Sequence, residues 1–281
     1  MVRNPYFPNI VTKFSLNPDV VDIIGFCTKN PKPMFQYLDE LSCYKQFWYV
    51  TITGFDKDLE PNVPPIEETI ESFKYLSNKI GKNAMGWRYT PIIINKKYTV
   101  EHHIKTFERI AKELSNYTSL VAFGFLDLYD KLQRIHPELK DCSDEDKIIL
   151  AKAFKEIATK YGLELRLCSK EKRLKQYGID VDGCMRIEDY ERAAQEKLHI
   201  KQKMQARKSY CTCYLSNDIG AYSSCMHLCT YCYANGNKDE IFLNFKKHDD
   251  HSPFLIGGFK EGDKIKEANQ ESYLTKQITL F

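Results

Sequence analysis

Three cysteines late in the chain have the residue type and spacing that bind an iron–sulfur cluster. Cys225, Cys229 and Cys232 form a Cys-x3-Cys-x2-Cys pattern, with Tyr231 directly before the last cysteine. Thiolates are the usual ligands of such clusters, and a [4Fe–4S] cluster takes one ligand at each iron. Three closely spaced cysteines can hold three irons and leave the fourth open to a ligand from outside the protein. The sequence therefore predicts a [4Fe–4S] cluster at these three positions.

Two other interpretations of this segment stay open. Zinc also binds cysteine and histidine, and Cys229-x2-Cys232 has the spacing of half a zinc site. His227, or Cys211 together with Cys213, would complete a tetrahedral zinc site. The remaining interpretation, thiols that bind nothing, is disfavoured by the density of cysteines in this short stretch.

The pattern, including the aromatic residue before its third cysteine, resembles the signature of the radical S-adenosylmethionine (SAM) enzymes. The resemblance implies that the open iron binds SAM and that a donor such as flavodoxin or ferredoxin reduces the cluster. SAM is then cleaved, and a radical abstracts hydrogen from a substrate. In such enzymes the cofactor carries the difficult chemistry, while the protein binds and orients the reactants.

Four other cysteines are candidates for an auxiliary [4Fe–4S] cluster: Cys168, Cys184, Cys211 and Cys213. Cys168 closes a predicted strand, Cys184 follows a glycine in a predicted turn, and the last two precede the main cysteine segment. Four thiols at one mouth of a barrel would ligate such a cluster fully. The alternative is that Cys168 is a small core residue, and that Cys211 and Cys213 bind zinc or nothing.

Composition describes an ordinary globular protein. The 281 residues are 43% hydrophobic and 28% charged, and the net charge of +3 is too small to indicate nucleic-acid binding by itself. No apolar run reaches the roughly 18 residues of a membrane span, and residues 1–11 lack the apolar core of a signal peptide. We therefore expect a cytoplasmic protein, in which the ten cysteines stay reduced and are available to metals.

Strands and helices alternate along the first 200 residues. The Pro- and Asn-rich residues 1–19 are predicted as loops and turns. Short apolar runs predict strands at 20–27, 47–53, 84–94, 119–126 and 163–168. Helical periodicity, with Thr99 and Ser143 as expected N-caps, predicts helices at 33–44, 65–80, 100–114, 144–161 and 187–197.

This alternation predicts a parallel sheet with helices outside, curled into a full or partial (β/α) barrel of the radical SAM type. Chemistry in such barrels lies at the carboxyl ends of the strands. We place Lys29, Asn30, Arg88 and Asp127 there. Lys29 and Asn30, together with Tyr231 of the cysteine segment, are expected to contact the cofactor. Arg88 and Asp127 are expected to act as catalytic residues that touch SAM or the substrate.

Five segments resemble an uncharacterised bacterial family that is known only as a domain of unknown function. They are 28–31, 87–91, 127–129, 218–222 and 225–235. Radical SAM enzymes usually carry the cysteine loop after the first strand, whereas here it follows the last, so the resemblance implies a permuted barrel. A fainter likeness, to the DNA-repair enzyme spore photoproduct lyase, is confined to the Cys-x3-Cys-x2-Cys-Tyr pattern.

The last five residues resemble the peptide by which bacterial DNA polymerases and repair enzymes bind the sliding clamp. Gln277 would set the register, while Leu280 and Phe281 would fill an apolar groove. The alternative is that the two apolar residues pack on the core. A basic stretch at 201–208 is either a solvated surface or a site for an anionic substrate.

These observations lead to three functional hypotheses. The first is a radical SAM enzyme that acts on DNA or a nucleotide, in repair or modification, and the second is one that acts on a peptide or small metabolite. The third is a non-enzymatic zinc-binding module. We expect three parts: a barrel-like domain at 1–200, a cluster-binding segment at 201–240 and a C-terminal extension at 241–281.

Overall fold

The computed structural model describes residues 1–168, 170–200, 213–214 and 217–274. The chain divides into two compact units. The first unit combines residues 1–21, 56–62 and 216–272, and the second combines 22–55, 63–215 and 273–281. Three separate stretches of sequence therefore build the first unit.

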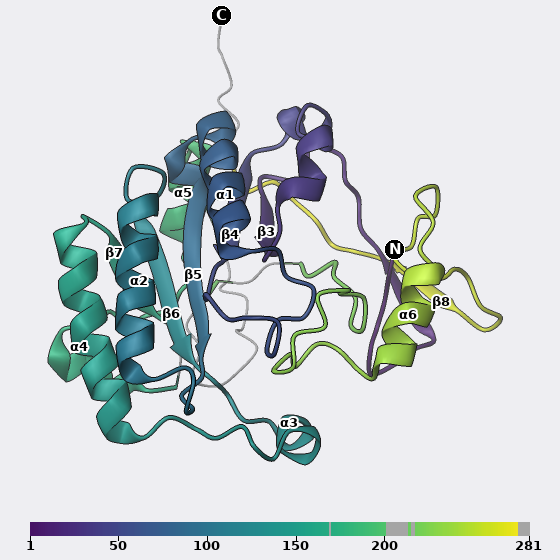
Figure 1. Cartoon of the computed structure of the whole chain (residues 1–281). Helices are drawn as coiled ribbons and strands as arrows, with labels where there is room; N and C mark the ends of the chain where they lie inside the picture. The colour runs from purple at the N-terminus through teal and green to yellow at the C-terminus, as the bar shows by residue number, and fades with distance from the viewer. Residues whose placement is uncertain (169, 201–212, 215–216, 275–281) are drawn as a thin grey trace, which may run out of the picture. The chain divides into compact units, whose positions relative to one another are not determined.

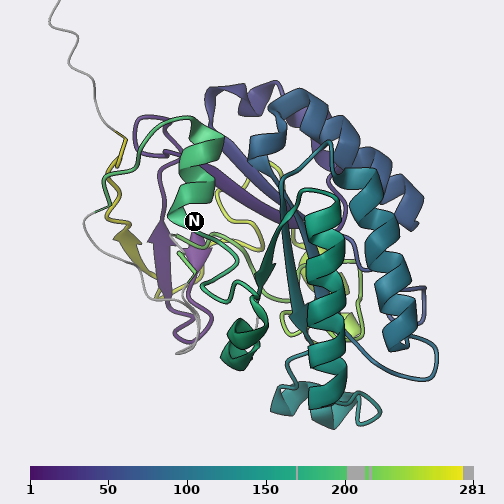
Figure 2. The same ribbon diagram turned by 90° about the vertical axis from the view of Figure 1, so that its left-hand side faces the viewer.

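A five-stranded parallel sheet is the centre of the second unit (Figure 1). Its strands lie in chain order: β3 (Ile24–Thr28), β4 (Gln46–Thr51), β5 (Met85–Ile92), β6 (Leu120–Phe125) and β7 (Glu164–Leu167). The long helices are α1 (Ile66–Ile80), α2 (Val100–Leu114) and α4 (Asp144–Lys160), and they lie side by side on one face of the sheet (Figure 2). The shorter helices are α3 (Asp130–Ile135), α5 (Ile187–Ala194) and the 3-10 turns η1 (Lys32–Tyr37), η2 (Glu40–Cys43), η3 (Lys82–Ala84) and η4 (Lys172–Tyr177).

Successive side chains of β5 point to opposite faces of the sheet, and both faces are buried. Trp87 and Tyr89 point to the helices, where both rings pack against Phe107 of α2. Phe107 in turn stacks on Phe154 of α4, with ring centroids 4.0 Å apart. Because side chains alternate along a strand, the intervening Arg88 lies on the opposite face of the sheet.

The opposite face of the sheet is covered by α5 rather than left open. Tyr190 of α5 packs against Phe47 of β4. On the same face, the ring of Tyr49 approaches Gly86 so closely that a Cβ there would lie 2.4 Å from a ring carbon. The prediction of helix 187–197 as part of an outer layer beside the other helices is thus wrong, although the helix itself is present.

A closed barrel is not formed by the described residues. The strand order ends at β3 on one side and at β7 on the other, and the two do not pair. One parallel bridge between Arg166 and Asp180 continues the sheet beyond β7. Of the expected full or partial barrel, the closed form is therefore not found among the described residues, because small barrels close with about eight strands and the chain turns onto the other face of the sheet after β7. A partial barrel of the radical SAM type stays a prediction.

The two predicted helix N-caps, Thr99 and Ser143, are confirmed. The Thr99 hydroxyl caps α2 by accepting from the backbone N–H of His102, and Ser143 caps α4 in the same way through Asp146. The predicted helix at 33–44 is wrong: η1 and η2 replace it, and η1 contains Pro33 in its first turn. Short 3-10 turns satisfy fewer backbone groups than a helix and are typical connectors.

The first unit contains a small sheet that joins the two ends of the described chain. Its strands are β1 (Val2–Arg3), β2 (Ile10–Lys13) and β8 (Lys264–Glu267), in the order β1-β2-β8. Arg3 binds Asp263 through two hydrogen bonds, and its guanidinium lies over the Phe254 ring. The prediction of loops throughout 1–19 is wrong for β1 and β2: β1 pairs with β2, and the other neighbour of β2 is β8, about 250 residues further along the chain.

His103 provides a pH-dependent contribution to stability. Its Nδ1 lies 2.7 Å from the Tyr89 hydroxyl and its Nε2 lies 3.0 Å from the Ile93 carbonyl oxygen. Burial, the largest effect, lowers the pKa of His103 from 6.5 to about 4. Between these pH values the unfolded chain binds a proton that the folded chain does not, so the free energy of unfolding is highest above pH 6.5 and falls as the pH drops.

We expect His103 to lower the free energy of unfolding by about 3 kcal/mol between pH 7 and pH 4, because each pKa unit corresponds to about 1.4 kcal/mol. Urea titrations across this range will measure the effect. His103→Gln should flatten the pH profile, and His251→Gln, at an exposed histidine, is the matched control. An unchanged slope in His103→Gln would show that other groups cause the pH dependence.

Candidate functional site

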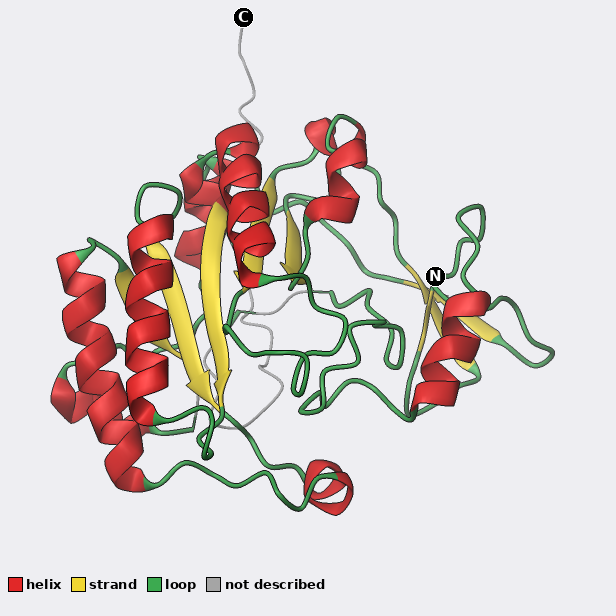
Figure 3. Cartoon of the chain, viewed as in Figure 1, coloured by secondary structure: helices red, strands yellow, loops and turns green. Residues whose placement is uncertain are grey.

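The cysteine segment forms a loop whose two ends are tied together. The backbone N–H of Ser223 donates to Ala234 O at 2.9 Å, and that of Gly236 donates to Ser223 Oγ at 2.9 Å. Inside the loop, Asn235 Nδ2 donates to Cys225 O at 3.0 Å. No helix or strand lies within this loop (Figure 3). It therefore has the character of a compact Ω-loop, which packs on itself without regular structure.

Residues 56–62 of the same unit hold the tip of this loop from the other side, and we call them the clasp. Asn62 donates from its backbone N–H to His227 O at 3.1 Å and from Nδ2 to Met226 O at 2.8 Å. The backbone N–H of Thr230 donates to Leu59 O at 3.0 Å. These bonds fix the backbone between and around the cysteines through main-chain and Asn62 side-chain contacts.

Tyr231 anchors the loop to a buried carboxylate. Its hydroxyl donates to Glu60 of the clasp, whose side chain is buried, and it also lies near the Cys229 sulfur. Burial, followed by the negative charges of Glu60 and Cys229, raises the pKa of Tyr231 well above its usual value. The hydroxyl therefore remains a neutral donor at any physiological pH. The aromatic residue before the third cysteine thus has a structural role in this loop.

Replacing Tyr231 by phenylalanine tests this anchor. The substitution leaves the Glu60 carboxylate without the hydroxyl that it accepts from, and such losses cost about 1–3 kcal/mol. We expect the free energy of unfolding to fall by that amount and proteolysis of the loop to become several-fold faster. Tyr222→Phe, at an exposed tyrosine outside the three cysteines, is the matched control. Equal proteolysis rates in the two variants would contradict the anchoring role.

The chemistry of the loop fits an iron–sulfur cluster. Its three thiols are accessible, since Cys225 is exposed while Cys229 and Cys232 are half-buried. Cys229 and Cys232 are joined by a turn in which the backbone N–H of the second donates to the carbonyl of the first at 3.1 Å. In the described ranges no three cysteine, histidine or acidic side chains are already gathered as a metal site. Loading a cluster would therefore require the three thiols to move toward one another.

Several predicted site residues of the second unit lie at the carboxyl edge of its sheet. Lys29 and Asn30 follow β3, Asp127 follows β6, and Cys168 follows β7. Lys29 Nζ lies 3.3 Å from the Thr53 hydroxyl at the end of the neighbouring strand. Their contacts with a cofactor or substrate stay a prediction.

Arg88 lies in the middle of β5 rather than at its end, because the strand continues through Pro91 to Ile92. Its Nη2 is 3.5 Å from the Cys168 sulfur and its Nη1 is 3.9 Å from the Cys184 sulfur. The guanidinium also lies over the Tyr49 ring, 5.4 Å from its centroid. Arg88 is therefore part of a cysteine cluster on the face of the sheet opposite α2.

Three of the four cysteines predicted for a second cluster do come together, and we call Cys168, Cys184 and Cys213 the thiol trio. The sulfurs of Cys184 and Cys213 are 3.5 Å apart, and the Cys184 sulfur also interacts with that of Cys168. In a [4Fe–4S] cluster each cysteine binds a separate iron, which keeps the ligand sulfurs apart. Sulfurs in direct contact with each other and with a guanidinium do not fit that arrangement. The thiol trio is therefore not assigned as the site of a second cluster.

Other predicted site residues lie outside the described residues. They are Cys211, the basic stretch 201–208, and the tail residues Gln277, Leu280 and Phe281. Conversely, Glu60 and Asn62 of the clasp were missed by sequence reasoning. Both stand in a Pro-rich loop without periodicity, and only the tertiary fold brings them to the cysteines. A glutamate and an asparagine in such a loop carry no local signal of a distant partner.

The described residues define a mixed α/β protein with a five-stranded parallel sheet in one unit and a clasped cysteine loop in the other. The chain belongs to the family described as Domain of unknown function (DUF1848), which matches residues 1–234. That match spans both the sheet and the cysteine loop.

Two other comparisons add little to this assignment. No curated protein matches the chain. Among solved structures, the chain is similar to a "putative alpha-L-fucosidase" from Bacteroides thetaiotaomicron, with 12% identity and a TM-score of 0.27 over 58% of this chain and 48% of that one. At this TM-score the likeness carries no argument, and the match spans about half the length of that protein. Within the described ranges, no helix combines the length and apolarity that a membrane crossing requires.

Proposed function

We propose that this protein is a radical SAM enzyme whose [4Fe–4S] cluster is held by Cys225, Cys229 and Cys232. The observation that carries the proposal is a loop of three accessible thiols whose backbone is hydrogen-bonded at its base and at its tip. Three thiol ligands suit a cluster with one iron open to an outside ligand. When bound, such a cluster supplies the electron that cleaves SAM and so starts hydrogen abstraction from a substrate.

The protein's own residues hold and orient the reactants in this proposal. Tyr231 and Asn62 keep the loop backbone in place, so that the thiols move only through their side chains. Lys29 and Asn30 are proposed to contact the cofactor. Asp127, which follows β6, is proposed to contact SAM or the substrate, whereas Arg88 lies within β5 and contacts the sulfurs of Cys168 and Cys184.

Anaerobic reconstitution with iron and sulfide tests the proposal. We expect about four irons per chain, one for each corner of the cluster, and an electron paramagnetic resonance spectrum that changes when SAM is added. A reductant with SAM should then yield 5'-deoxyadenosine. A spectrum that does not respond to SAM would overturn the assignment. Protein that remains colourless after anaerobic purification and holds zinc would instead support the zinc-binding module.

The substrate class is proposed to be DNA or a nucleotide, because the tail Gln277-x2-Leu280-Phe281 resembles a clamp-binding peptide. A pull-down with the bacterial sliding clamp separates this proposal from a peptide or small-metabolite substrate. We expect the full chain to be retained and the Leu280→Ala/Phe281→Ala variant to be lost. Equal retention of both chains would remove the argument for DNA.

A further inference from the structure

The thiol trio joins three segments of the second unit that are distant in sequence. Cys168 directly follows β7, Cys184 precedes α5, and Cys213 lies beyond it. Besides the 3.5 Å contact between the sulfurs of Cys184 and Cys213, the backbone N–H of Cys184 donates to the Cys213 sulfur at 3.2 Å. Cys184 therefore touches both other members of the trio and stands at its centre.

Arg88 gives the trio a positive charge that must be balanced. Among the residues that the structure describes, the guanidinium pairs with no carboxylate, and its polar side-chain contacts are the sulfurs of Cys168 and Cys184. A charge that is withdrawn from water is costly unless an opposite charge accompanies it. The hydrogen bond from Cys184, together with the charge of Arg88, lowers the pKa of Cys168 to about 6 against the opposing effect of burial. The group that balances Arg88 is thus the Cys168 thiolate.

Exposure divides the trio into one reachable thiol and two protected ones. Cys168 is half-buried, whereas Cys184 and Cys213 are buried. The Cys168 residue thus keeps partial solvent exposure although burial acts on its thiol, and it is the member of the trio that a small reagent meets before the buried Cys184. Thiolate character combined with access is what makes a cysteine susceptible to oxidation.

We propose that the thiol trio is a redox site that reduces a hydroperoxide, with Cys168 as the reacting thiolate and Cys184 and Cys213 as the pair that ends as a disulfide. This inference goes beyond the radical SAM proposal and does not depend on it. Arg88 acts as a positioning residue, because it holds the Cys168 thiolate and does not itself react.

The reaction begins when the Cys168 thiolate attacks an oxygen of the hydroperoxide. A sulfur–oxygen bond forms and the oxygen–oxygen bond breaks, so Cys168 is oxidised to a sulfenic acid. The departing oxygen takes the proton of the Cys184 thiol and leaves as an alcohol, or as water from hydrogen peroxide. The resulting Cys184 thiolate attacks the Cys168 sulfur, forms a disulfide and releases hydroxide.

The disulfide then moves within the trio. The released hydroxide takes the proton of Cys213 and becomes water, and the Cys213 thiolate attacks the Cys184 sulfur that it already contacts. Cys168 leaves as the thiolate next to Arg88, because a thiol of low pKa is the better leaving group. The net reaction consumes two thiols and one hydroperoxide, and it gives one disulfide, one alcohol and one water. An external dithiol would reduce the disulfide again.

Peptide mass spectrometry after brief treatment with hydrogen peroxide tests this inference. The parent protein is the full chain with Cys225, Cys229 and Cys232 replaced by serine, so that neither failure nor success of the cluster proposal affects the result. We expect Cys168 to react about tenfold faster than the exposed Cys43 and the Cys184–Cys213 disulfide to accumulate. Cys184→Ser should trap the sulfenic acid at Cys168, where dimedone captures it.

Variants of Arg88 separate positioning from folding. Arg88→Met should slow the oxidation of Cys168 several-fold, and Arg88→Lys should restore part of the rate because it restores the positive charge. Peroxide that modifies Cys43 as fast as Cys168, or that leaves Cys184 and Cys213 as thiols, would overturn the inference. So would one tightly bound metal ion per parent chain that is lost in Cys184→Ser, since the trio would then be a metal site.

Discussion

Replacing Cys232 by serine is expected to lower the iron content of the reconstituted protein from about four per chain to less than one. Serine offers a hard, neutral hydroxyl where iron in a cluster requires a thiolate. With only two cysteines left in the loop, the cluster loses one of its three anchors. Production of 5'-deoxyadenosine from SAM should fall below detection in the same variant. Iron and sulfide analysis, together with product detection by mass spectrometry, measure both effects.

Cys43→Ser is the matched control for this experiment, because Cys43 is an exposed thiol of the second unit. It should keep the iron content and the activity of the parent. The Cys232→Ser chain should retain its far-ultraviolet circular dichroism, since the loop contains no helix or strand. Full iron content in Cys232→Ser would show that the cluster, if present, lies elsewhere in the chain.

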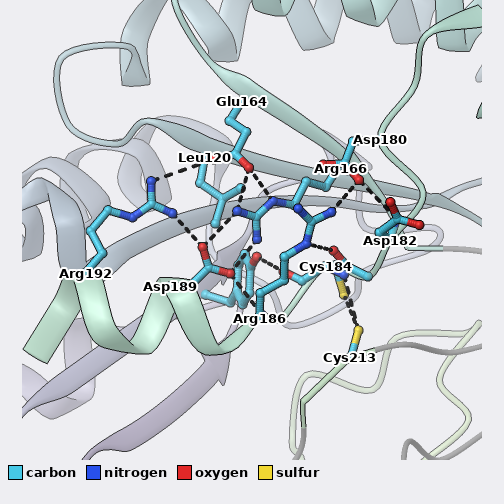
Figure 4. A network of polar contacts seen from close by, with 12 residues as sticks. Leu120, Glu164, Arg166, Asp180, Asp182, Cys184, Arg186, Asp189, Arg192 and Cys213 are labelled. Carbon is cyan, nitrogen blue, oxygen red and sulfur yellow. Dashed lines mark hydrogen bonds and ion pairs between the residues drawn. The ribbon is translucent and has the colours of Figure 1, made fainter. Parts of the chain in front are cut away.

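Replacing Asp189 by alanine is expected to lower the free energy of unfolding more than any other single substitution proposed for this protein. Asp189 binds the Arg166 guanidinium through two hydrogen bonds of 2.5 and 2.9 Å, and both side chains are at least 97% buried (Figure 4). Arg192 Nη2 and the backbone N–H of Arg186 also donate to this carboxylate, at 2.6 and 3.0 Å. Removing one partner of a buried ion pair costs about 3–5 kcal/mol, because the other charge stays buried without compensation.

Urea unfolding measures this loss, and a double variant identifies its cause. Arg166→Met/Asp189→Leu removes both charges, so it should be more stable than Asp189→Ala alone. Lys13→Ala, which breaks an exposed pair with Glu267, should change the free energy of unfolding by less than about 1 kcal/mol. If Asp189→Ala lowers the free energy of unfolding by less than about 1 kcal/mol, then Glu164, which also pairs with Arg166, is enough to balance the buried Arg166 charge.

The elements of the second unit could be predicted wherever the signal is local. Helix α2 combines a capping threonine with an apolar stripe of helical period, and all of these residues lie within one stretch of sequence. The side of the sheet on which a helix lies is not a local property. Tyr190 of α5 packs on Phe47, and the sequence near either residue gives no indication of this contact. The same limit applies to β1 and β2, whose sheet is completed by the distant β8.

The candidate site shows the same division between local and distant information. The spacing of Cys225, Cys229 and Cys232 predicts a ligand set, because ligands close in sequence need only a flexible loop to share a cluster. The proximity of Cys168, Cys184 and Cys213 was predicted, but the direct contact between the Cys184 and Cys213 sulfurs and the place of Arg88 beside Cys168 and Cys184 were not, since several separate segments contribute. Their predicted use as ligands of a second cluster rested on residue type and on their expected place at one barrel mouth.

The sequence by itself determined the parallel α/β character, the helix caps and the loop of three thiols, because periodicity, capping and ligand spacing are properties of neighbouring residues. Only the tertiary structure decided that Glu60 and Asn62 clasp the loop, that the five strands of the described residues form an open sheet, and that Arg88 faces thiols. Contacts of this second kind depend on which distant surfaces bury one another, and that choice minimises the free energy of the whole chain rather than of any segment.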